Sequence, residues 1–319
     1  MFNKVIGHDT IKEYFEKILL SGNMPHSYIF QGQAGVGKMT MARAIAKNLI
    51  CSSQDACNTC KDCHQFEVGT HPDIITLETT KIEEVREKVV REINIKPYQS
   101  QHKIIFIPQA DTLNIQSQNA LLKTIEEPPS YATIILMTAN VELLLPTIRS
   151  RCLIIRFNDL SDTEMKNYFS AINYNKDKEE IYIRFSSGSI GTAQKLINDE
   201  SFLTLRDESI NYLNRLETAD MIALYKIADE LVEDKLRLVE ILNFWELWYR
   251  DIMIYKTNNQ AILYYPDYEG LLIDICNKLT YNKISMNLKV IQKSRIDISN
   301  NVYAMFVVEN LLLDLKEKK

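Results

Sequence analysis

The sequence predicts an α/β domain with a parallel sheet at its amino-terminal end, followed by parts of the chain that consist of helices only. In residues 27–157, short apolar segments alternate with segments of helical periodicity, as in parallel sheets that are buried on both faces. Beyond residue 160, apolar residues recur every three or four positions, which indicates amphipathic helices. Only 9 glycines and 8 prolines occur in 319 residues, and this scarcity also favours helix.

The alternating region contains the elements that a parallel sheet with helices on both faces requires. Strands are expected at residues 27–30, 74–77, 104–107, 133–137 and 153–157. Helices are expected at about residues 38–50, 82–93 and 114–126, where apolar side chains have helical spacing. Pro128 and Pro129 end the last of these helices, because proline has no amide proton and its ring clashes with the preceding turn.

The helical region divides into two predicted domains. Ser161 and Glu164 have the spacing of a capping box, which marks the start of a helix. We therefore expect a small helical domain at 159–204, between an α/β domain at 1–158 and a third domain at 205–319. The third domain contains two helical runs of apolar residues, Leu238, Ile241, Leu242, Trp245, Trp248, Tyr249 and Ile252, and Val302, Met305, Phe306, Leu312 and Leu313. These runs predict the core of a helical bundle, and periodicity alone does not show an oligomerisation collar.

The overall charge does not indicate a nucleic-acid-binding surface. The chain has 37 basic and 42 acidic residues, a net charge of −5 and a pI near 5.7, whereas nucleic-acid-binding domains usually have a basic excess. Lys81, Arg86, Lys88 and Arg91 share one segment with several glutamates, so a solvated face is expected there. The chain shows neither an amino-terminal signal nor an apolar stretch of about 20 residues, so we expect a cytoplasmic protein with no membrane partner.

A glycine-rich segment after the first expected strand has the pattern of a phosphate-binding loop. Gly32-Gln33-Ala34-Gly35-Val36-Gly37-Lys38 matches G-x-x-x-x-G-K and precedes a predicted helix. Glycines allow backbone amides to converge on phosphate oxygens, the helix amino terminus adds positive potential, and the lysine reaches the outer phosphates. With a strand before it and a helix after it, this segment predicts a P-loop fold in which ATP or ADP can bind.

The residues that place the metal and the base in P-loop ATPases are replaced. Met39 stands where a serine or threonine ligates Mg²⁺, and a thioether is a poor ligand for this hard cation. Thr40 comes one position late. The third expected strand is followed by Pro108 and Gln109 in place of an acidic pair. Asp111 lies past the strand end, and we expect it to cap the next helix. These replacements predict an ATPase fold without efficient hydrolysis.

Four of the six cysteines lie close together, at Cys51, Cys57, Cys60 and Cys63. Four thiolates at this spacing suit a tetrahedral Zn²⁺ site that leaves no coordination position open for chemistry. In a cytosolic chain such clustering indicates a metal and not a disulfide framework. His64 is adjacent and is an alternative ligand, although a solvated neighbour is the simpler interpretation. Residues 51–63 therefore predict a structural zinc knuckle.

Three further motifs, together with the phosphate loop and the cysteine cluster, make the chain resemble a known family. They are His26-Ser27-Tyr28-Ile29-Phe30, Gln118-Asn119-Ala120-Leu121-Leu122-Lys123-Thr124-Ile125-Glu126-Glu127-Pro128-Pro129 and Ile148-Arg149-Ser150-Arg151-Cys152. In order and spacing, over about residues 1–200, the chain is similar to bacterial DNA polymerase III clamp-loader subunits of the gamma/tau and delta-prime type. The last third resembles the family less, although Trp248-Tyr249-Arg250-Asp251 is similar to the delta-prime collar.

This resemblance implies an AAA+ module, a three-helix lid at 159–204 and a collar at 205–319 that joins five subunits in an open ring. Such a ring loads the sliding clamp onto primed DNA. The implied partners are therefore gamma/tau and delta subunits, the clamp and, through the assembled complex, DNA. The replacements at Met39, Pro108 and Gln109 are characteristic of delta-prime chains, so the resemblance implies a subunit that does not hydrolyse ATP itself.

The resemblance also implies roles for particular residues. Arg151 corresponds to the arginine that reaches the ATP site of the neighbouring subunit, where a permanently charged, forked guanidinium matches phosphate oxygens. Arg149 is a competitor for this role. Val5 and Ile6 correspond to the segment that packs beside adenine. Thr192 stands where active members have a phosphate-sensing arginine, which is a further argument against hydrolysis.

Two alternatives are open at this point. The chain is a hydrolysing gamma/tau-type ATPase if Thr40 or Asp111 restores metal binding. A P-loop kinase with a zinc-containing lid agrees less well with the sequence, because neither a metal-handling acid nor an acceptor site is evident. Nucleotide binding does not separate a gamma/tau-type subunit from a delta-prime subunit, since Lys38 and the loop glycines serve both. Hydrolysis separates them.

Overall fold

The chain folds into two compact units. The computed structural model describes residues 2–53, 55–79, 81–174, 176–258 and 262–317, with the backbone alone for 176 and 177. One unit, the sheet unit, consists of Met1–Tyr174 with Ser186–Gln194; the other, the helical unit, consists of Asn175–Phe185 with Lys195–Lys319. The division into domains at 1–158, 159–204 and 205–319 stays a prediction. Among the helices described, none is both long enough and apolar enough to cross a membrane.

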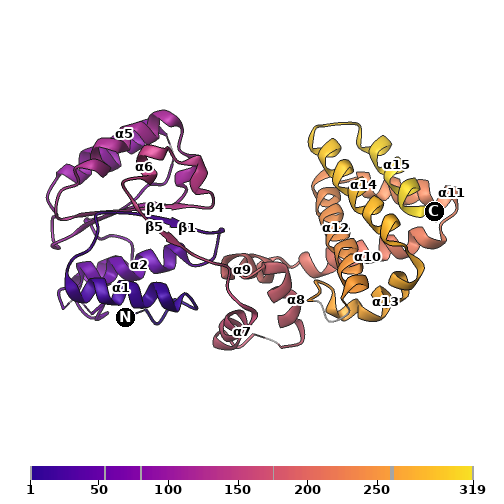
Figure 1. Ribbon diagram of the computed structural model, residues 1–319, viewed down its shortest axis with the longest axis horizontal. Helices are drawn as coiled ribbons and strands as arrows, with labels where there is room; N and C mark the ends of the chain where they lie inside the picture. The colour runs from indigo at the N-terminus through magenta and orange to yellow at the C-terminus, as the bar shows by residue number, and fades with distance from the viewer. Residues whose placement is uncertain (1, 54, 80, 175, 259–261, 318–319) are drawn as a thin grey trace. The chain divides into compact units, whose positions relative to one another are not determined.

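Five parallel strands form the centre of the sheet unit, as predicted. They are β1 (Ser27–Gln31), β2 (Ile74–Thr76), β3 (Lys103–Ile107), β4 (Ala132–Thr138) and β5 (Leu153–Arg156). Their order across the sheet is β2-β3-β4-β1-β5, and every neighbouring pair is parallel (Figure 1). The loops that follow β1, β3 and β4 therefore meet at one edge of the sheet. This is the predicted parallel α/β architecture, with the glycine-rich loop directly after β1.

Helices cover both faces of this sheet. They are α1 (Asp9–Ser21), α2 (Lys38–Ile50), α3 (Lys61–Glu67), α5 (Ile115–Glu126) and α6 (Pro146–Arg149). The sheet unit also contains α7 (Asp162–Ala171) and the start of α9 (Ile190–Asn198), which contribute no residue to the two cores beside the sheet. In Figure 1, α1 and α2 lie below the strands, and α5 and α6 lie above them. Successive residues of a strand point to opposite faces, so Phe30 packs in the core below the sheet and Ile29 in the core above it. Because β1 is buried between these two cores, its position in the sheet is fixed, and with it the start of the phosphate loop.

The capping box at the start of α7 is confirmed. The Ser161 hydroxyl accepts a hydrogen bond from the Glu164 amide at 3.3 Å, and the Glu164 carboxylate accepts one from the Ser161 amide at 2.8 Å. This exchange satisfies two amides that the first turn of a helix otherwise leaves unbonded. It ends the segment that follows β5 and starts the helical part of the chain.

The helix predicted at residues 82–93 is present, but most of it is not an α-helix. The structure has one α-helical turn, α4 (Ile82–Glu84), then a π-helix, η1 (Val85–Arg91), and a 3₁₀ turn, η2 (Glu92–Asn94). Val85, Val89 and Ile93 are all fully buried in one core, four residues apart. The segment therefore presents one apolar face to the sheet, and the apolar spacing does not indicate which helix type forms that face.

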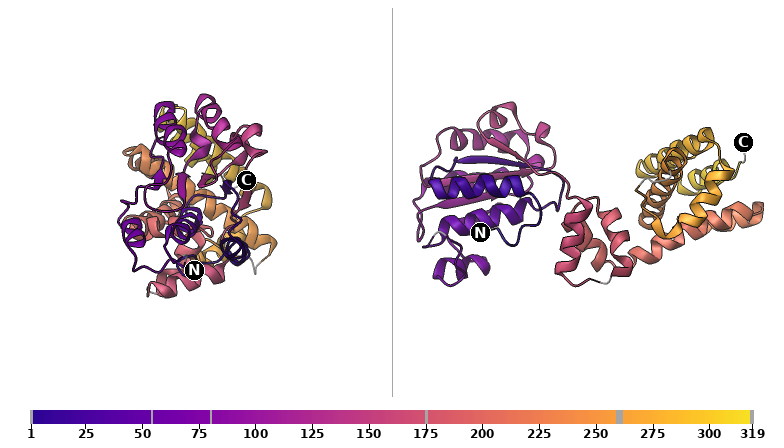
Figure 2. Two further views of the ribbon diagram at one scale, coloured as in Figure 1. Left: turned by 90° about the vertical axis from the view of Figure 1, so that its left-hand side faces the viewer. Right: turned by 60° about the horizontal axis from the view of Figure 1, so that its bottom comes forward.

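The helical unit is a bundle with a continuous core. Its helices are α8 (Lys176–Ser186), α10 (Phe202–Thr218), α11 (Met221–Val232), α12 (Lys235–Thr257), α13 (Glu269–Lys278), α14 (Tyr281–Ser299) and α15 (Ala304–Lys316). α14 packs against both α12 and α15 (Figure 2). The predicted run on α12, from Leu238 to Ile252, is buried, with Trp245 and Trp248 at its centre. This part of the predicted bundle core is confirmed.

The second predicted run, near the carboxyl end, is partly wrong. Leu312 is buried, but Phe306 is 62 % exposed and Val302 is 43 % exposed. α15 begins at Ala304, and its buried side chains are Val307, Val308, Leu311, Leu312 and Leu315. Phe306 and Val307 are both apolar and lie about 100° apart on the helix, so apolar character alone did not identify the buried one.

Candidate functional site

The phosphate loop lies between β1 and α2, at the sheet edge where the strands end. Gly35 and Gly37 have φ values of 77° and 108°, in the region that favours glycine, and they turn the chain into α2. Within the part of the chain that the structure describes, the backbone amides of residues 34–40 donate no internal hydrogen bond. These amides are available to phosphate oxygens at a helix amino terminus, as the sequence predicted.

A turn of the sheet unit, residues 186–191, packs against the phosphate loop and donates hydrogen bonds to it. The Ser189 hydroxyl donates to the Ala34 carbonyl at 2.8 Å, and the Gly191 amide donates to the Gly35 carbonyl at 2.9 Å. A Cβ atom on Gly191 would lie 2.6 Å from the Gly35 Cα, so the two backbones touch. The sequence signal for this turn was the Gly-Ser-Ile-Gly run, but the contact with the loop was not predicted.

His8 is a second support of the loop that sequence reasoning missed. Its Nε2 lies 2.8 Å from the Val36 carbonyl oxygen, and its ring packs edge-on against Phe157. The His8 backbone is left-handed, with a φ of 56°, at the turn before α1. A lone histidine next to Gly7 has no sequence signature, because its partner lies 28 positions away.

Lys38 lies inside the cavity that the loop borders. Its ammonium donates to the carbonyls of Gly32 and Gln33, at 2.6 and 2.7 Å. Burial lowers the pKa of Lys38, and the nearby Asp111 carboxylate opposes this shift. The cavity has a volume of about 800 Å³, which is large enough for a nucleotide.

The structure brings together the residues predicted for nucleotide binding. Cavity-lining residues include Val5, Ile6, Gly35, Val36, Gly37, Lys38, Met39 and Thr40. Gly32 lies at the start of the loop and accepts from the Lys38 ammonium. The hydrophobic pair Val5 and Ile6 lines the same cavity as the loop.

The cavity lacks the acidic pair of an ATPase. Pro108 and Gln109 follow β3 and line the cavity, and Asp111 is the one acidic residue among the described residues that line it. The Asp111 carboxylate accepts a hydrogen bond from the Ala139 amide, at 2.9 Å. Our expectation that Asp111 caps the next helix is wrong. Asn114 caps α5, because its side chain, three positions before Ser117, reaches the Ser117 amide at 2.8 Å.

Arg151 lies outside this cavity, on the surface after α6. Its Nε is 2.9 Å from the Glu126 carboxylate and its Nη1 is 3.0 Å from the Thr147 carbonyl, while its side chain is 40 % exposed. Arg149 pairs with Glu142 at 2.5 Å and is less exposed, at 26 %. Arg151 is thus the more accessible of the two arginines.

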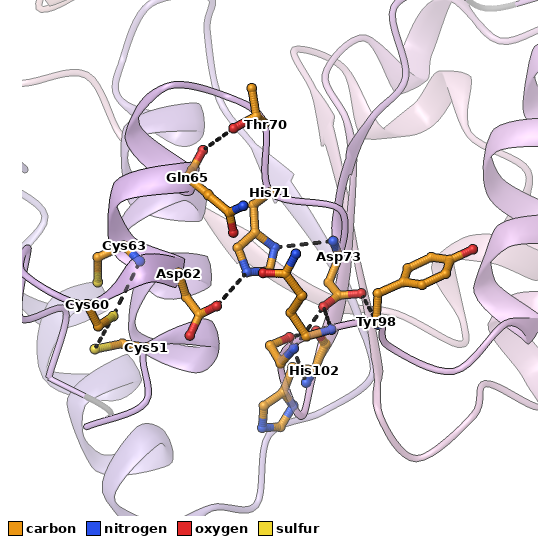
Figure 3. Close-up of polar contacts among 12 residues, drawn as sticks. Cys51, Cys60, Asp62, Cys63, Gln65, Thr70, His71, Asp73, Tyr98 and His102 are labelled. Atoms are coloured by element: carbon orange, nitrogen blue, oxygen red, sulfur yellow. Dashed lines mark hydrogen bonds and ion pairs between the residues drawn. The ribbon is translucent and has the colours of Figure 1, made fainter.

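The four cysteines of the predicted zinc knuckle meet in space. The sulfur atoms of Cys51, Cys57, Cys60 and Cys63 all lie within 4.8 Å of one another. Tetrahedral zinc, with Zn–S bonds of about 2.3 Å, requires sulfurs about 3.8 Å apart, so small movements suffice. Backbone amides of residues 57, 60 and 63 donate to the sulfurs of the preceding cysteines, each at 3.4 Å. The donor set and these amide contacts fit a closed thiolate site, shown in part in Figure 3.

The surroundings shift the pKa values of two of these thiols in opposite directions. Hydrogen bonds from the Thr59 side chain and from backbone amides lower the pKa of Cys57 to about 5. Burial raises the pKa of Cys63 to about 12. His64 is exposed and lies outside the group of close sulfur atoms that the described residues form. The described residues that could hold a metal ion here are therefore the four cysteines.

A chain of polar contacts connects the knuckle to the sheet, and the sequence did not predict it (Figure 3). Asp62 of α3 lies 3.6 Å from Nε2 of His71, whose Nδ1 accepts a hydrogen bond from the Asp73 amide at 3.2 Å. The buried Asp73 carboxylate then accepts three backbone amides, of Tyr98, Gln99 and Ser100, at 2.6 to 2.9 Å. The sequence signal for these contacts is the short run His71-Pro72-Asp73 directly before β2.

Asp73→Asn is expected to lower the free energy of unfolding by about 3 kcal/mol, because an amide cannot accept from all three donors. Burial raises the pKa of Asp73, but the three backbone hydrogen bonds outweigh this effect and leave the pKa below its usual value. The stabilisation is therefore present above the unfolded-state pKa and is lost as the pH falls through the folded-state pKa, below about pH 4.

Urea unfolding at pH 7 and at pH 3.5 checks this prediction, with Asp9→Asn, at an exposed position, as the control. The difference between the unaltered chain and Asp73→Asn is expected to be smaller at the lower pH. An equal loss at both pH values, or a loss as large for Asp9→Asn, would contradict the role given to this carboxylate.

Known proteins match this chain over its sheet unit and beyond. The family described as DNA polymerase III, delta subunit, matches residues 7–161. The DNA polymerase III subunit gamma of Buchnera aphidicola (subsp. Schizaphis graminum) is 35 % identical over 68 % of this chain and 62 % of its own length. The chain thus spans less than two thirds of this gamma subunit. The subunit delta' of Bacillus subtilis is 24 % identical over 92 % of each chain.

Among solved structures, a DNA polymerase III gamma-subunit-related protein from Thermotoga maritima has a TM-score of 0.42 at 17 % identity. It covers 98 % of this chain and 99 % of that one. The family match covers the phosphate loop, the cysteine cluster and Arg151, and the delta' relative extends over both units. The chain is therefore similar to the DNA polymerase III subunits gamma and delta', over the sheet unit most of all.

Proposed function

We propose that this chain is a delta-prime-type clamp-loader subunit, which assembles with ATPase subunits and does not hydrolyse ATP itself. One observation carries the proposal. The phosphate loop is formed and its amides are free, yet Met39, Pro108 and Gln109 line the cavity where an ATPase places its metal ligand and acidic pair. Phosphoryl transfer depends on metal and charge placed around the transferred group, so binding without turnover is expected.

Nucleotide binding is a separate part of the proposal. Gly32, Gly35, Val36, Gly37 and Lys38 would hold the phosphates of ATP or ADP, and Val5 and Ile6 would contact the base. Met39 follows Lys38 in the first turn of α2, at the position where a metal-binding hydroxyl is absent, and Thr40 comes one position later. We expect weak, non-productive binding, because the favourable contribution of Mg²⁺ to phosphate binding is missing.

The proposed partners are gamma/tau and delta subunits, the sliding clamp and, through the assembled complex, primed DNA. The helical unit supports a role in assembly. α11 and α15 pack against each other, and both expose large apolar side chains, Ile222 and Tyr225 on α11 and Tyr303 and Phe306 next to or on α15. Large apolar side chains that are exposed in the chain by itself are typical of subunit interfaces. Arg151 would meet the ATP site of the neighbouring subunit.

A structural zinc ion is also proposed, held by Cys51, Cys57, Cys60 and Cys63. Four thiolates complete a tetrahedral shell, so the ion would contribute folding energy and no reaction chemistry. Cys51 and Cys63 are buried and connect the knuckle to α2 and α3, respectively. This agrees with a knuckle that is fastened to the sheet unit.

The purified chain is expected to hydrolyse ATP no faster than its Lys38→Ala variant, in the presence of Mg²⁺ and primed DNA. Lys38→Ala removes the phosphate-binding ammonium and so defines the background of the assay. Steady-state phosphate release by both proteins checks the prediction. Turnover by the unaltered chain that Lys38→Ala abolishes would favour the alternative, a hydrolysing gamma/tau-type subunit, for which the similarity to gamma subunits is the supporting observation.

A further inference from the structure

The helical unit encloses a second cavity, far in sequence from the phosphate loop. It lies among α10, α12, the turn from α13 to α14, and the end of α15, and has a volume of about 530 Å³. Its walls are largely apolar and aromatic, with Leu216, Trp248, Leu279 and Leu315 among them. Size and lining are those of a site for a small organic molecule.

One charged side chain of this cavity lacks a counter-charge. Lys283 of α14 lines the cavity and is only 5 % exposed. Its ammonium donates to the Asp314 carbonyl at 2.7 Å, which uses one of its three N–H groups. Among the described residues no carboxylate forms an ion pair with it. A buried ammonium with a single carbonyl partner is costly unless an anion completes its environment.

Asn287 lies one turn further along α14 and is buried as well. Its side chain is 2 % exposed and forms a hydrogen bond with Tyr249, a residue that lines the cavity. Residues four apart share one face of a helix, so Asn287 and Lys283 lie on the same side of α14. The buried donor at this cavity that still lacks acceptors is therefore the Lys283 ammonium.

The other charged groups at this cavity are more exposed than Lys283. Lys278 pairs with Glu217 at 2.8 Å, and both line the cavity. Lys316 donates to the Ala219 carbonyl, beyond the end of α10, and Glu317 lies at the exposed end of α15. With three lysines and two glutamates the lining has a net positive charge, and Lys283 is the buried cation among them.

We propose that this cavity binds an amphipathic carboxylate, with the carboxylate on Lys283 and the apolar body against Trp248, Leu216 and Leu279. The apolar walls favour a hydrocarbon or aromatic body, and the buried ammonium favours an anionic head. This site is independent of nucleotide binding and of the proposed role in clamp loading. A neutral ligand of the same shape lacks the head group and binds more weakly.

Decanoate is a suitable probe, with decanol as its neutral counterpart. The chain contains two tryptophans, Trp245 and Trp248, and the second lines the cavity, so tryptophan emission reports binding in the full chain. Decanoate is expected to change this emission and to bind at least about tenfold more tightly than decanol, the difference that a charge-assisted hydrogen bond supplies.

Lys283→Met keeps the length of the side chain and removes its charge. This variant is expected to bind decanoate about tenfold more weakly and decanol as before, whereas Lys289→Met, at an exposed position of α14 outside the cavity, keeps both affinities. Equal decanoate binding by Lys283→Met and the unaltered chain would overturn the proposal. If Lys283→Met fails to fold, the unaltered chain still decides, because equal affinity for decanoate and decanol, or no binding of either, rejects the site.

Discussion

Arg151→Ala is expected to slow ATP hydrolysis at one site of an assembled clamp loader by a factor of about 10³ or more. In the proposed ring, this guanidinium would stand beside the phosphates of the neighbouring subunit, where a permanent positive charge offsets the charge that develops in the transition state. The folding of the chain should not change. Arg151 is 40 % exposed, and its contact with Glu126 is a surface ion pair of small energetic value.

Single-turnover hydrolysis by a complex reconstituted with gamma/tau and delta subunits checks this prediction. Arg149→Ala is the matched control, because Arg149 lies two positions away and is engaged by Glu142. Arg151→Lys should recover little of the rate, since an ammonium lacks the planar fork. If Arg149→Ala lost activity and Arg151→Ala kept it, Arg149 would be the arginine that acts at the neighbouring ATP site. Full activity in both variants would reject an arginine supplied by this chain.

The phosphate loop and the cysteine group were predictable because each is built within one short segment. The seven residues from Gly32 to Lys38 carry their own turn geometry, and the strand and helix around them follow from local apolar patterns. The four cysteines lie within 13 residues, so few loop conformations keep their sulfurs apart. Sequence reasoning succeeds where the chemistry and its support are contiguous.

The supports of the site were not predictable for the opposite reason. The Ser189 hydroxyl contacts a carbonyl 155 positions away, and the Asp73 carboxylate receives amides 25 to 27 positions away. Neither residue type is unusual where it stands. The π-helix at Val85–Arg91 has no signal in the spacing of its apolar residues, because an α-helix gives the same buried face. Such features appear only when distant segments are placed together.

Cys63→Ser is expected to lower zinc affinity by a factor of more than about 100, and to unfold the knuckle locally. Structural zinc sites contribute about 10–16 kcal/mol over four ligands, so the loss of one thiolate removes roughly 3 kcal/mol. α3 has only seven residues, too few for a stable isolated helix. Phe66 and Cys63 provide its buried contacts, so the metal is expected to supply much of its stability.

Zinc content after dialysis, and limited proteolysis between residues 51 and 70, check this prediction, with Cys152→Ala, a cysteine outside the group, as the control. The unaltered chain and the control should retain one zinc per chain and resist cleavage there. Because Asp62 of α3 contacts His71, the loss of the metal should also loosen the loop that Asp73 holds, while the two cores of the sheet stay protected from hydrogen exchange. Zinc bound equally by Cys63→Ser would exclude Cys63 as a ligand. Protection lost throughout the sheet would instead show that the knuckle is part of the global fold, and that the Asp62–His71–Asp73 connection is too strong to separate from it.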